Sequence, residues 1–387
     1  MSLKKDSKKQ NNVSGRVMAV DVLRGLTVCL MILVDDNVGV EFEFLKHPVW
    51  TGISLADFVF PSFITLMGVS MYFSLSKYDF KFSGKAIFRI VRRFVLLFVC
   101  GVLIARTCVG VDAAFEGGSF FGAFGDFGSW RLMGILQRIA LCYLFAGLIV
   151  LCVHNRKVLI GVIVGLLVGY SVVLGIGSGY ELSDSNVLIA VDKALLSPGH
   201  MYQKMTTYDG SRILYDPEGL LSTVPCIAQT LIGFLVGDLI KDKSKSGTTK
   251  VLYMFIAGFS MLVAGYLVGL FIPAFKKAWT APFALIMVGV DVCLLALFTW
   301  IIDVKKKNKW CTFFRVYGTN AVLTFAIMYI VWAVLDGAGL TLATYEFLLP
   351  ICFGVEGLAS ILTTTIFILI LYVLLYFLDK KKIYLRL

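Results

Sequence analysis

Long apolar runs alternate with short polar and basic segments along almost the whole chain. The runs reach or approach the roughly 20 residues that an α-helix needs to cross the hydrocarbon core of a bilayer. Backbone polar groups in lipid find partners only within helices or closed barrels, so the pattern predicts an all-α, polytopic integral membrane bundle of about ten transmembrane helices. The predicted spans are residues 18–36, 54–76, 87–107, 132–153, 158–177, 221–240, 251–272, 281–302, 313–335 and 357–378. A shorter run, residues 344–354, predicts a re-entrant or interfacial helix and leaves the count open by about one span.

Composition agrees with this pattern. Of 387 residues, 58% are hydrophobic and 16% are charged, whereas soluble domains have about 45–50% apolar and about 25% charged residues. No Gly/Ser-rich linker and no internal repeat with a period of about 20 to 50 residues interrupts the apolar runs. We therefore expect one membrane domain over residues 17–379 between two basic tails, residues 1–16 and 380–387.

The positive charges decide the predicted orientation. The formal net charge is +11, which by itself is compatible with binding to nucleic acid. However, the lysines and arginines occur in short clusters on every second connection between apolar runs. The clusters lie within residues 4–16, 77–93, 156–157, 241–250, 305–309 and 380–382. This is the positive-inside pattern, so we expect a lipid bilayer rather than nucleic acid as the partner, with both termini in the cytoplasm.

Several signatures of cofactor chemistry are missing. Most of the nine cysteines lie inside apolar runs, where cysteine behaves as a small apolar residue. We find no metal-ligand spacing of His, Cys and carboxylates, no Gly-rich phosphate loop followed by Lys-Ser/Thr, and no Gly-x-Ser-x-Gly elbow. The sequence predicts no metal site.

Charged residues inside the predicted spans need a partner, a wet cavity or a function, because each costs at least ~2.5–3.5 kcal/mol at the bilayer centre. Asp21 and Arg24 open the first span on one helix face, either as an interfacial ion pair or as the cytoplasmic lining of a cavity. Asp57 and Arg138, with Gln137 beside the latter, lie at comparable depth near the outer ends of the second and fourth spans. We expect Asp57 and Arg138 to pair in an outer cavity, whether for structure or for function.

One of the three histidines has a distinctive context. In "FLKHPVWTGISLADFVFPSF", residues 44–63, His47 precedes Pro48, Trp50 and Asp57 where the chain re-enters the membrane on the outer side. Histidine titrates near neutrality and serves as nucleophile or general base. His200 lies in another outer loop and is a weaker candidate for substrate contact, and His154 is expected to be exposed at the cytoplasmic surface.

Six motifs, in order along nearly the whole chain, resemble one family. They are "DVLRGLTVCLMILVDD", "KHPVWTGISLADFVFPSF", "GILQRIALCY", "YDPEGLLSTVPCIAQTLIGFLVGDLI", "FIPAFKKAWT" and "YGTNAVLTF". Together they are similar to the transmembrane acyltransferases typified by heparan-alpha-glucosaminide N-acetyltransferase, whose bacterial members include NagX-like proteins. The resemblance implies transfer of an acetyl group from cytosolic acetyl-CoA to the amine of a glucosamine-type sugar on the far side of the membrane. For a bacterial member it also implies location in the inner (cytoplasmic) membrane.

The resemblance also implies roles for individual residues. The histidine of the family's His-x-x-Trp motif maps onto His47, and its tryptophan maps onto Trp50. An asparagine that precedes this histidine in the family reads Asp35 or Asp36 here, and of the family's Asn-Lys pair only the lysine carries over, as Lys277.

The resulting set of candidate residues has three parts. The catalytic candidates are His47, Asp35, Asp36 and Asp57; those for binding acetyl-CoA are Arg24, Gln137 and Arg138; those for binding the acceptor are Trp50, Lys277 and His200. His47 would act as general base in a direct transfer or would form a transient acetyl-imidazole. Arg138 or Gln137 would stabilise the oxyanion.

Other readings stay open at this stage. An O-acetyltransferase of an envelope glycan would use the same donor and chemistry with a different acceptor. A sugar or anion transporter would use Asp57, Arg138 and Asp291 as substrate or proton sites, although the sequence has no internal symmetry of the kind that many transporters show. The expected partners are acetyl-CoA, an amino sugar or glycan acceptor and the bilayer. A homodimer is a further option.

Overall fold

The computed structural model describes residues 17–203, 205–207 and 210–385. Within these ranges the protein is helical, with two isolated β-bridges, Gly52–Phe275 and Thr206–Arg212. The helices are α1 (Met18–Asp35), α2 (Val59–Leu75), α3 (Gly84–Phe115), α4 (Phe120–Gly125), α5 (Ile135–Cys152), α6 (Arg156–Ile176), α7 (Val187–Leu196), α8 (Thr223–Lys241), α9 (Gly247–Gly269), α10 (Ala281–Phe298), α11 (Thr312–Thr319), α12 (Ala321–Gly337), α13 (Leu340–Ile351) and α14 (Glu356–Lys380). The predicted basic tail 1–16 and residues 386–387 lie outside the described residues.

The predicted class, an all-α membrane bundle, is confirmed. In the described part of the chain, eight helices are long and apolar enough to cross a membrane, or nine if a bent pair counts as one span. The helix α1, where the sequence also predicts a span, is not among them and contains the three charged residues Asp21, Arg24 and Asp35. The predicted short helix near residues 344–354 is α13, which has 12 residues.

The ninth predicted span, residues 313–335, is not one straight helix. It is broken between α11 and α12, which meet at an angle of 76°. At the break, Asn320 has a non-helical backbone (φ −129°, ψ 46°). Its side-chain amide donates to the carbonyl of Ile383 and accepts from the backbone N–H of Leu385. The break therefore gives the C-terminal segment two hydrogen bonds that a continuous helix would not offer.

Glycines at helix crossings bring the central helices into backbone contact. A Cβ on Gly68 of α2 would lie 2.1 Å from the carbonyl oxygen of Thr230 in α8, and one on Gly233 of α8 would lie 2.2 Å from that of Thr65 in α2. On α1, a Cβ at Gly25 would lie 1.7 Å from the carbonyl oxygen of Phe314 in α11. Small residues allow such close approach in membrane bundles, where van der Waals packing drives association.

The helices divide into an inner group and an outer group. In α8 and α2, 78% and 67% of the most apolar window is buried inside the protein, against 22% in α9 and 28% in α6. The exposed faces of α9 and α6 are apolar, as lipid-facing surfaces are. Thus α2 and α8 form the middle of the bundle, and the side chains at their ends are placed where the connecting segments converge.

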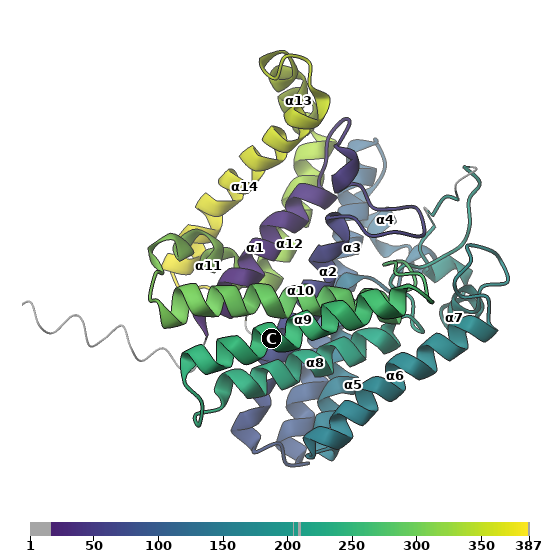
Figure 1. Cartoon of the computed structure of the whole chain (residues 1–387). Helices are drawn as coiled ribbons and strands as arrows, with labels where there is room; N and C mark the ends of the chain where they lie inside the picture. Colours follow the sequence, from purple (N-terminus) through teal and green to yellow (C-terminus); the bar gives the residue numbers. More distant parts are fainter. Residues whose placement is uncertain (1–16, 204, 208–209, 386–387) are drawn as a thin grey trace, which may run out of the picture.

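One end of the bundle gathers the segments that the sequence analysis singled out. The C-terminal ends of α1, α3 and α9 and the N-terminal ends of α2, α5, α8 and α10 meet there. The short helices α4 and α7 belong to the connecting segments at this end, at the right of Figure 1. We refer to it as the His47 end.

Candidate active site

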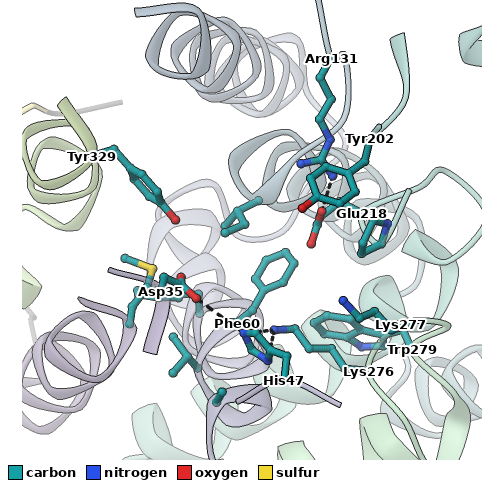
Figure 2. Close-up of a pocket in the computed structure, with 16 residues that line it drawn as sticks. Asp35, His47, Phe60, Arg131, Tyr202, Glu218, Lys276, Lys277, Trp279 and Tyr329 are labelled. Carbon is teal, nitrogen blue, oxygen red and sulfur yellow. Dashed lines mark hydrogen bonds and ion pairs between the residues drawn. The ribbon is translucent and has the colours of Figure 1, made fainter. Parts of the chain in front are cut away.

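A cavity of about 230 Å³ lies at the His47 end. It is lined by residues from α1, α2, α5, α12 and four connecting segments. They are Met31, Asp35, His47, Ala56, Val59, Phe60, Phe63, Arg131, Ile135, Tyr202, Pro217, Glu218, Lys276, Lys277, Trp279 and Tyr329. Figure 2 shows an aromatic middle around Phe60 with two groups of charged side chains on either side of it.

His47 is held by a buried carboxylate. Its Nδ1 lies 2.7 Å from Oδ1 of Asp57, and the other oxygen of Asp57 accepts from the backbone N–H of Ser54 at 3.1 Å. Only 2% of the Asp57 side chain is exposed. Because an ionised carboxylate can only accept, the shared proton belongs to Nδ1 of His47, and Nε2 keeps its lone pair. Nε2 lies 3.6 Å from Oδ1 of Asp35, which lines the cavity.

Lys276 completes the charge set around His47, and sequence reasoning missed it. Its Nζ lies 3.5 Å from each ring nitrogen of His47 and 3.7 Å from Oδ1 of Asp57. The family resemblance selected the adjacent Lys277, which lines the cavity and whose backbone carbonyl accepts from the hydroxyl of Tyr215 at 2.7 Å. The motif "FIPAFKKAWT" contained both lysines, but nothing local in it shows which one faces His47.

The pKa of His47 is the outcome of opposing effects. Burial by itself lowers the pKa, but the carboxylates of Asp35 and Asp57 outweigh burial and raise it above the ordinary value, while the Lys276 ammonium acts against them. An imidazole whose pKa is above its ordinary value is a stronger proton acceptor, which suits a general base.

Trp50 supports the site from outside the cavity. The side chain is 3% exposed, donates from Nε1 to the carbonyl of Tyr180 at 2.8 Å, and packs its ring against Tyr215 and Phe275. The β-bridge between Gly52 and Phe275 ties the His47 segment to the Lys276 segment. Trp50, expected at the acceptor, is therefore placed instead in the packing that aligns these two segments.

A second ion-pair group lies across the cavity. Arg131 donates to Asp216 at 2.6 and 3.2 Å and to Glu218 at 2.5 Å, and its guanidinium lies 4.6 Å from the ring centroid of Tyr202. Burial alone would raise the pKa of Glu218, but Arg131 holds it at about 2. The carboxylate of Glu218, which lines the cavity, is therefore ionised at neutral pH.

The expected ion pair between Asp57 and Arg138 is not present. Arg138 is fully buried, and its Nη2 donates to the carbonyls of Pro217 and Gly219 and to the hydroxyl of Ser222. Arg138 is thus hydrogen-bonded to the carbonyls of the segment before α8. The carboxylate of Asp57 is instead in contact with His47, Ser54 and Lys276. Arg138 stacks behind the cavity wall, 5.2 Å from the ring of Trp279 and 5.9 Å from that of Phe60.

A buried polar network holds the indole ring of Trp279, which lines the cavity. Its Nε1 donates to Gln229 at 3.1 Å, and Gln229 donates to the hydroxyl of Thr65 at 3.0 Å. Thr65 and Ser62 donate to the two oxygens of Asp291 at 2.6 and 2.5 Å. Asp291, considered above as a transport site, therefore joins α2 to α10 and does not line the cavity.

The remaining candidates lie elsewhere. Asp36 is 3% exposed and, unlike Asp35, does not line the cavity. Gln137 packs against Gly101 of α3. His200 pairs through Nδ1 with the carbonyl of Trp130 at 2.7 Å. Arg24 lies at the opposite end of α1 from Asp35, about 16 Å along the helix, where it donates to Ser70 at 2.6 Å and pairs with Asp21.

The structure thus separates the candidates into groups. His47, Asp35 and Lys277 line the cavity, and Asp57 contacts His47; the candidates outside it are Asp36, Arg24, Gln137, Arg138, Trp50 and His200. No group of three or more His, Cys, Asp or Glu side chains that could hold a metal ion occurs within residues 17–203, 205–207 and 210–385.

Comparisons with known proteins agree with the resemblance. The sequence model of the family described as "Heparan-alpha-glucosaminide N-acetyltransferase, catalytic" matches residues 16–214. Heparan-alpha-glucosaminide N-acetyltransferase of Homo sapiens is 25% identical over 368 residues, covering 80% of this chain and 52% of the relative. The protein of the same name from Mus musculus is 25% identical over 369 residues, covering 81% and 53%. The chain spans about half the length of these relatives. Since the family model covers more than half of the chain, the chain belongs to the heparan-alpha-glucosaminide N-acetyltransferase catalytic family.

Proposed function

We propose that this protein is a membrane-embedded acyltransferase that moves an acetyl group from acetyl-CoA to the amine of an amino sugar at the His47 end. The observation that carries the proposal is the 2.7 Å contact between Nδ1 of His47 and Asp57 at the edge of the cavity. This contact leaves Nε2 as a proton acceptor facing the place where an acceptor amine would lie. Membership of an acetyltransferase family supplies the reaction class.

The geometry favours direct transfer with His47 as general base. The acceptor nitrogen attacks the thioester carbonyl and forms the C–N bond, and its proton moves to Nε2 of His47. The tetrahedral intermediate then breaks the C–S bond, and His47 returns the proton to the leaving CoA sulfur. Asp57 and Asp35, 2.7 and 3.6 Å from the two ring nitrogens, stabilise the imidazolium that exists between these steps.

The size of the cavity limits what it holds. Pockets for drug-sized ligands span about 300–1,000 Å³, whereas this cavity has about 230 Å³. It therefore accommodates the acetyl thioester and one sugar ring, and the nucleotide part of acetyl-CoA lies outside it. Phe60, Trp279 and Tyr202 offer aromatic faces to the sugar ring, and Glu218 and Lys277 offer polar groups to its hydroxyls.

The positive-inside pattern gives the proposed orientation. It puts both termini in the cytoplasm and the His47 end on the outer side of a bacterial cytoplasmic membrane. The donor then comes from the basic, cytoplasmic end, where Arg24 lies, and the acceptor comes from outside. Arg138, whose buried Nε and Nη1 have no hydrogen-bond partner among the described residues, lies behind the wall of Phe60 and Trp279 and would bind donor oxygens if that wall moves.

The test measures acetyl transfer directly. Purified protein in detergent micelles is incubated with labelled acetyl-CoA and glucosamine, and the product is identified by mass. We expect His47→Ala to lose roughly 10²–10⁴-fold in rate, the range for a general base. The control is His154→Ala, because His154 is exposed at the other end of the bundle. Wild-type protein that transfers no acetyl group, or a His47→Ala variant as fast as wild type, would overturn the proposal.

The same assay separates the neighbouring alternatives. An acetyl group on the sugar oxygen instead of the nitrogen identifies an O-acetyltransferase. Acid quenching followed by mass analysis of the protein detects an acetyl-imidazole, which direct transfer does not form. Uptake of labelled sugar into liposomes without acetylation would instead identify a transporter.

A further inference from the structure

The side chain of Lys276 touches the reacting atoms of the proposed site. Its Nζ is 3.5 Å from Nδ1 and 3.5 Å from Nε2 of His47, so it is equally close to the nitrogen that Asp57 holds and to the nitrogen that faces the cavity. Figure 2 shows the lysine reaching across to the imidazole from the segment before α10. The side chain is 18% exposed and lines the cavity, so its ammonium group is partly shielded from water.

The backbone around Lys276 is fixed in a tight turn. The carbonyl of Lys276 accepts from the backbone N–H of Trp279 at 2.9 Å, and the hydroxyl of Thr280 accepts from the N–H of Phe275 at 3.2 Å. Trp279 has a left-handed backbone conformation with φ of 49°, which costs energy for a residue other than glycine. Strain of this kind persists where the surrounding structure enforces it, and here the turn aims Lys276 at His47.

Charged groups surround the contact between Lys276 and His47. Asp57 lies 3.7 Å from its ammonium group, and Asp35 lies on the other side of the imidazole, 3.6 Å from Nε2. Glu41 also acts on His47 electrostatically, whereas Lys46 is turned outward to Glu43. Among the described residues, Lys276 is the cation that contacts the imidazole, and Asp35 and Asp57 are the carboxylates that contact it.

We propose that Lys276 is a catalytic residue whose ammonium group stabilises the negative oxygen that forms on the acetyl carbonyl during transfer. This inference rests on the proposed acetyl transfer. When the amine attacks the carbonyl carbon, the electron pair of the C=O bond moves onto oxygen within reach of Nε2 of His47. Lys276 donates a hydrogen bond to that oxygen and releases it when the C=O bond re-forms and the C–S bond breaks. A positioned donor in this role contributes roughly 10²–10³-fold in rate.

The ammonium group has a second effect, on His47 itself. A positive charge next to the imidazole disfavours the imidazolium and so lowers the pKa of His47. Removal of the charge must therefore raise that pKa and move the acidic limb of the rate profile to higher pH. A lysine whose charge did not reach the imidazole would leave this titration where it is.

The experiment compares Lys276→Met, Lys276→Gln and Lys276→Arg with wild type. Lys277→Met, at the adjacent lysine that does not contact His47, is the control for the His47 titration only. We expect kcat to fall roughly a hundredfold in the Met and Gln variants, with KM little changed, and to recover in part with arginine. Labelled-histidine NMR in micelles follows the titration of His47, assigned through His47→Gln. We expect it to move to higher pH in Lys276→Met and Lys276→Gln but not in Lys277→Met.

The NMR titration and the measurement of kcat distinguish a failure of the proposed function from a failure of the role of Lys276. The NMR titration needs no acetyl transfer, so wild-type protein without transfer would defeat the proposed function and leave the titration result intact. An unchanged His47 titration together with an unchanged kcat in Lys276→Gln would overturn the role of Lys276. A fall of kcat that Lys276→Arg fails to relieve, with the titration unmoved, would overturn it as well.

Discussion

Two charged groups face each other across the same cavity, and they are built differently. The His47 group consists of His47, Asp57 and Lys276, and the Arg131 group consists of Arg131, Asp216 and Glu218. Each has one carboxylate that is almost fully buried, Asp57 with 2% and Asp216 with 0% of the side chain exposed. Arg131 donates hydrogen bonds to both carboxylates of its group, at 2.5–3.2 Å. In the His47 group only the contact between Nδ1 and Asp57 is that short, and the partners of Nε2 lie at 3.5 Å (Lys276) and 3.6 Å (Asp35).

This difference indicates which group stabilises the walls of the cavity and which group takes part in the reaction. A guanidinium is always charged and matches carboxylates in a fixed fork geometry, so the Arg131 group is a permanent clamp between the α4–α5 and α7–α8 connections. An imidazole changes its charge near neutrality and keeps one nitrogen for a substrate. Substitutions in the two groups should therefore affect different quantities.

The largest expected effect comes from Asp57→Asn. An amide can donate a hydrogen bond to Nδ1, which puts the proton of the imidazole on Nε2 and leaves no acceptor facing the cavity. We expect acetyl transfer to fall by roughly 10²–10⁴-fold, with thermal unfolding in detergent little changed. Asp36→Asn is the matched control, since Asp36 is a buried aspartate at the same end that does not line the cavity. Equal losses in both variants would contradict the assignment.

The next largest effect is expected on the stability of the protein. Arg131→Met leaves Asp216 and Glu218 facing each other without their cation, and breaking a buried pair in this way costs about 3–5 kcal/mol. We expect the midpoint of thermal unfolding in detergent to drop clearly. If Arg131→Met instead kept its unfolding midpoint and lost only acetyl transfer, the distinction between a clamp and a reactive group would fail.

The smallest effect is a pH dependence of stability. The pKa of Glu218 is about 2 in the fold against an ordinary value of 4.5. A lowered pKa means that the ionised form stabilises the fold above the unfolded-state value and that this contribution disappears as the pH falls from about 4.5 towards 2. The contribution is at most about 3 kcal/mol. Glu218→Gln should therefore be less stable than wild type at neutral pH, and the gap should narrow on acidification. A gap that is constant between pH 6 and pH 3 would show that Arg131 does not hold Glu218.

Predictions based on local patterns held up well. Apolar runs predicted the helices to within a few residues at most ends, because hydropathy and helix length depend only on neighbouring residues. They were less successful where the end of a helix depends on a distant partner. The helix α3 continues to Phe115, beyond the predicted end at residue 107, and α11 and α12 separate at Asn320, whose amide binds the C-terminal segment.

The candidate site shows the same division. The sequence indicated His47 from its position at the re-entry of the chain into the membrane, and the family resemblance reinforced it. It could not choose between Asp35 and Asp36, because successive residues at a helix end differ only in the direction in which they point. It also paired Asp57 with Arg138 from their similar depth, although depth along the bundle says nothing about direction around it.

The sequence by itself determined that this chain forms a helical membrane bundle, that His47 lies in the connection between the first two predicted spans, and which family it belongs to. These follow from hydropathy and from motifs read in order. Only the tertiary structure decided that Lys276 lies against His47, 229 positions away, and that Arg131 is closed by Asp216 from 85 positions away. The physical reason is that such contacts depend on how closely the helices approach at Gly68, Gly233 and Gly25, and that packing is a property of the whole bundle.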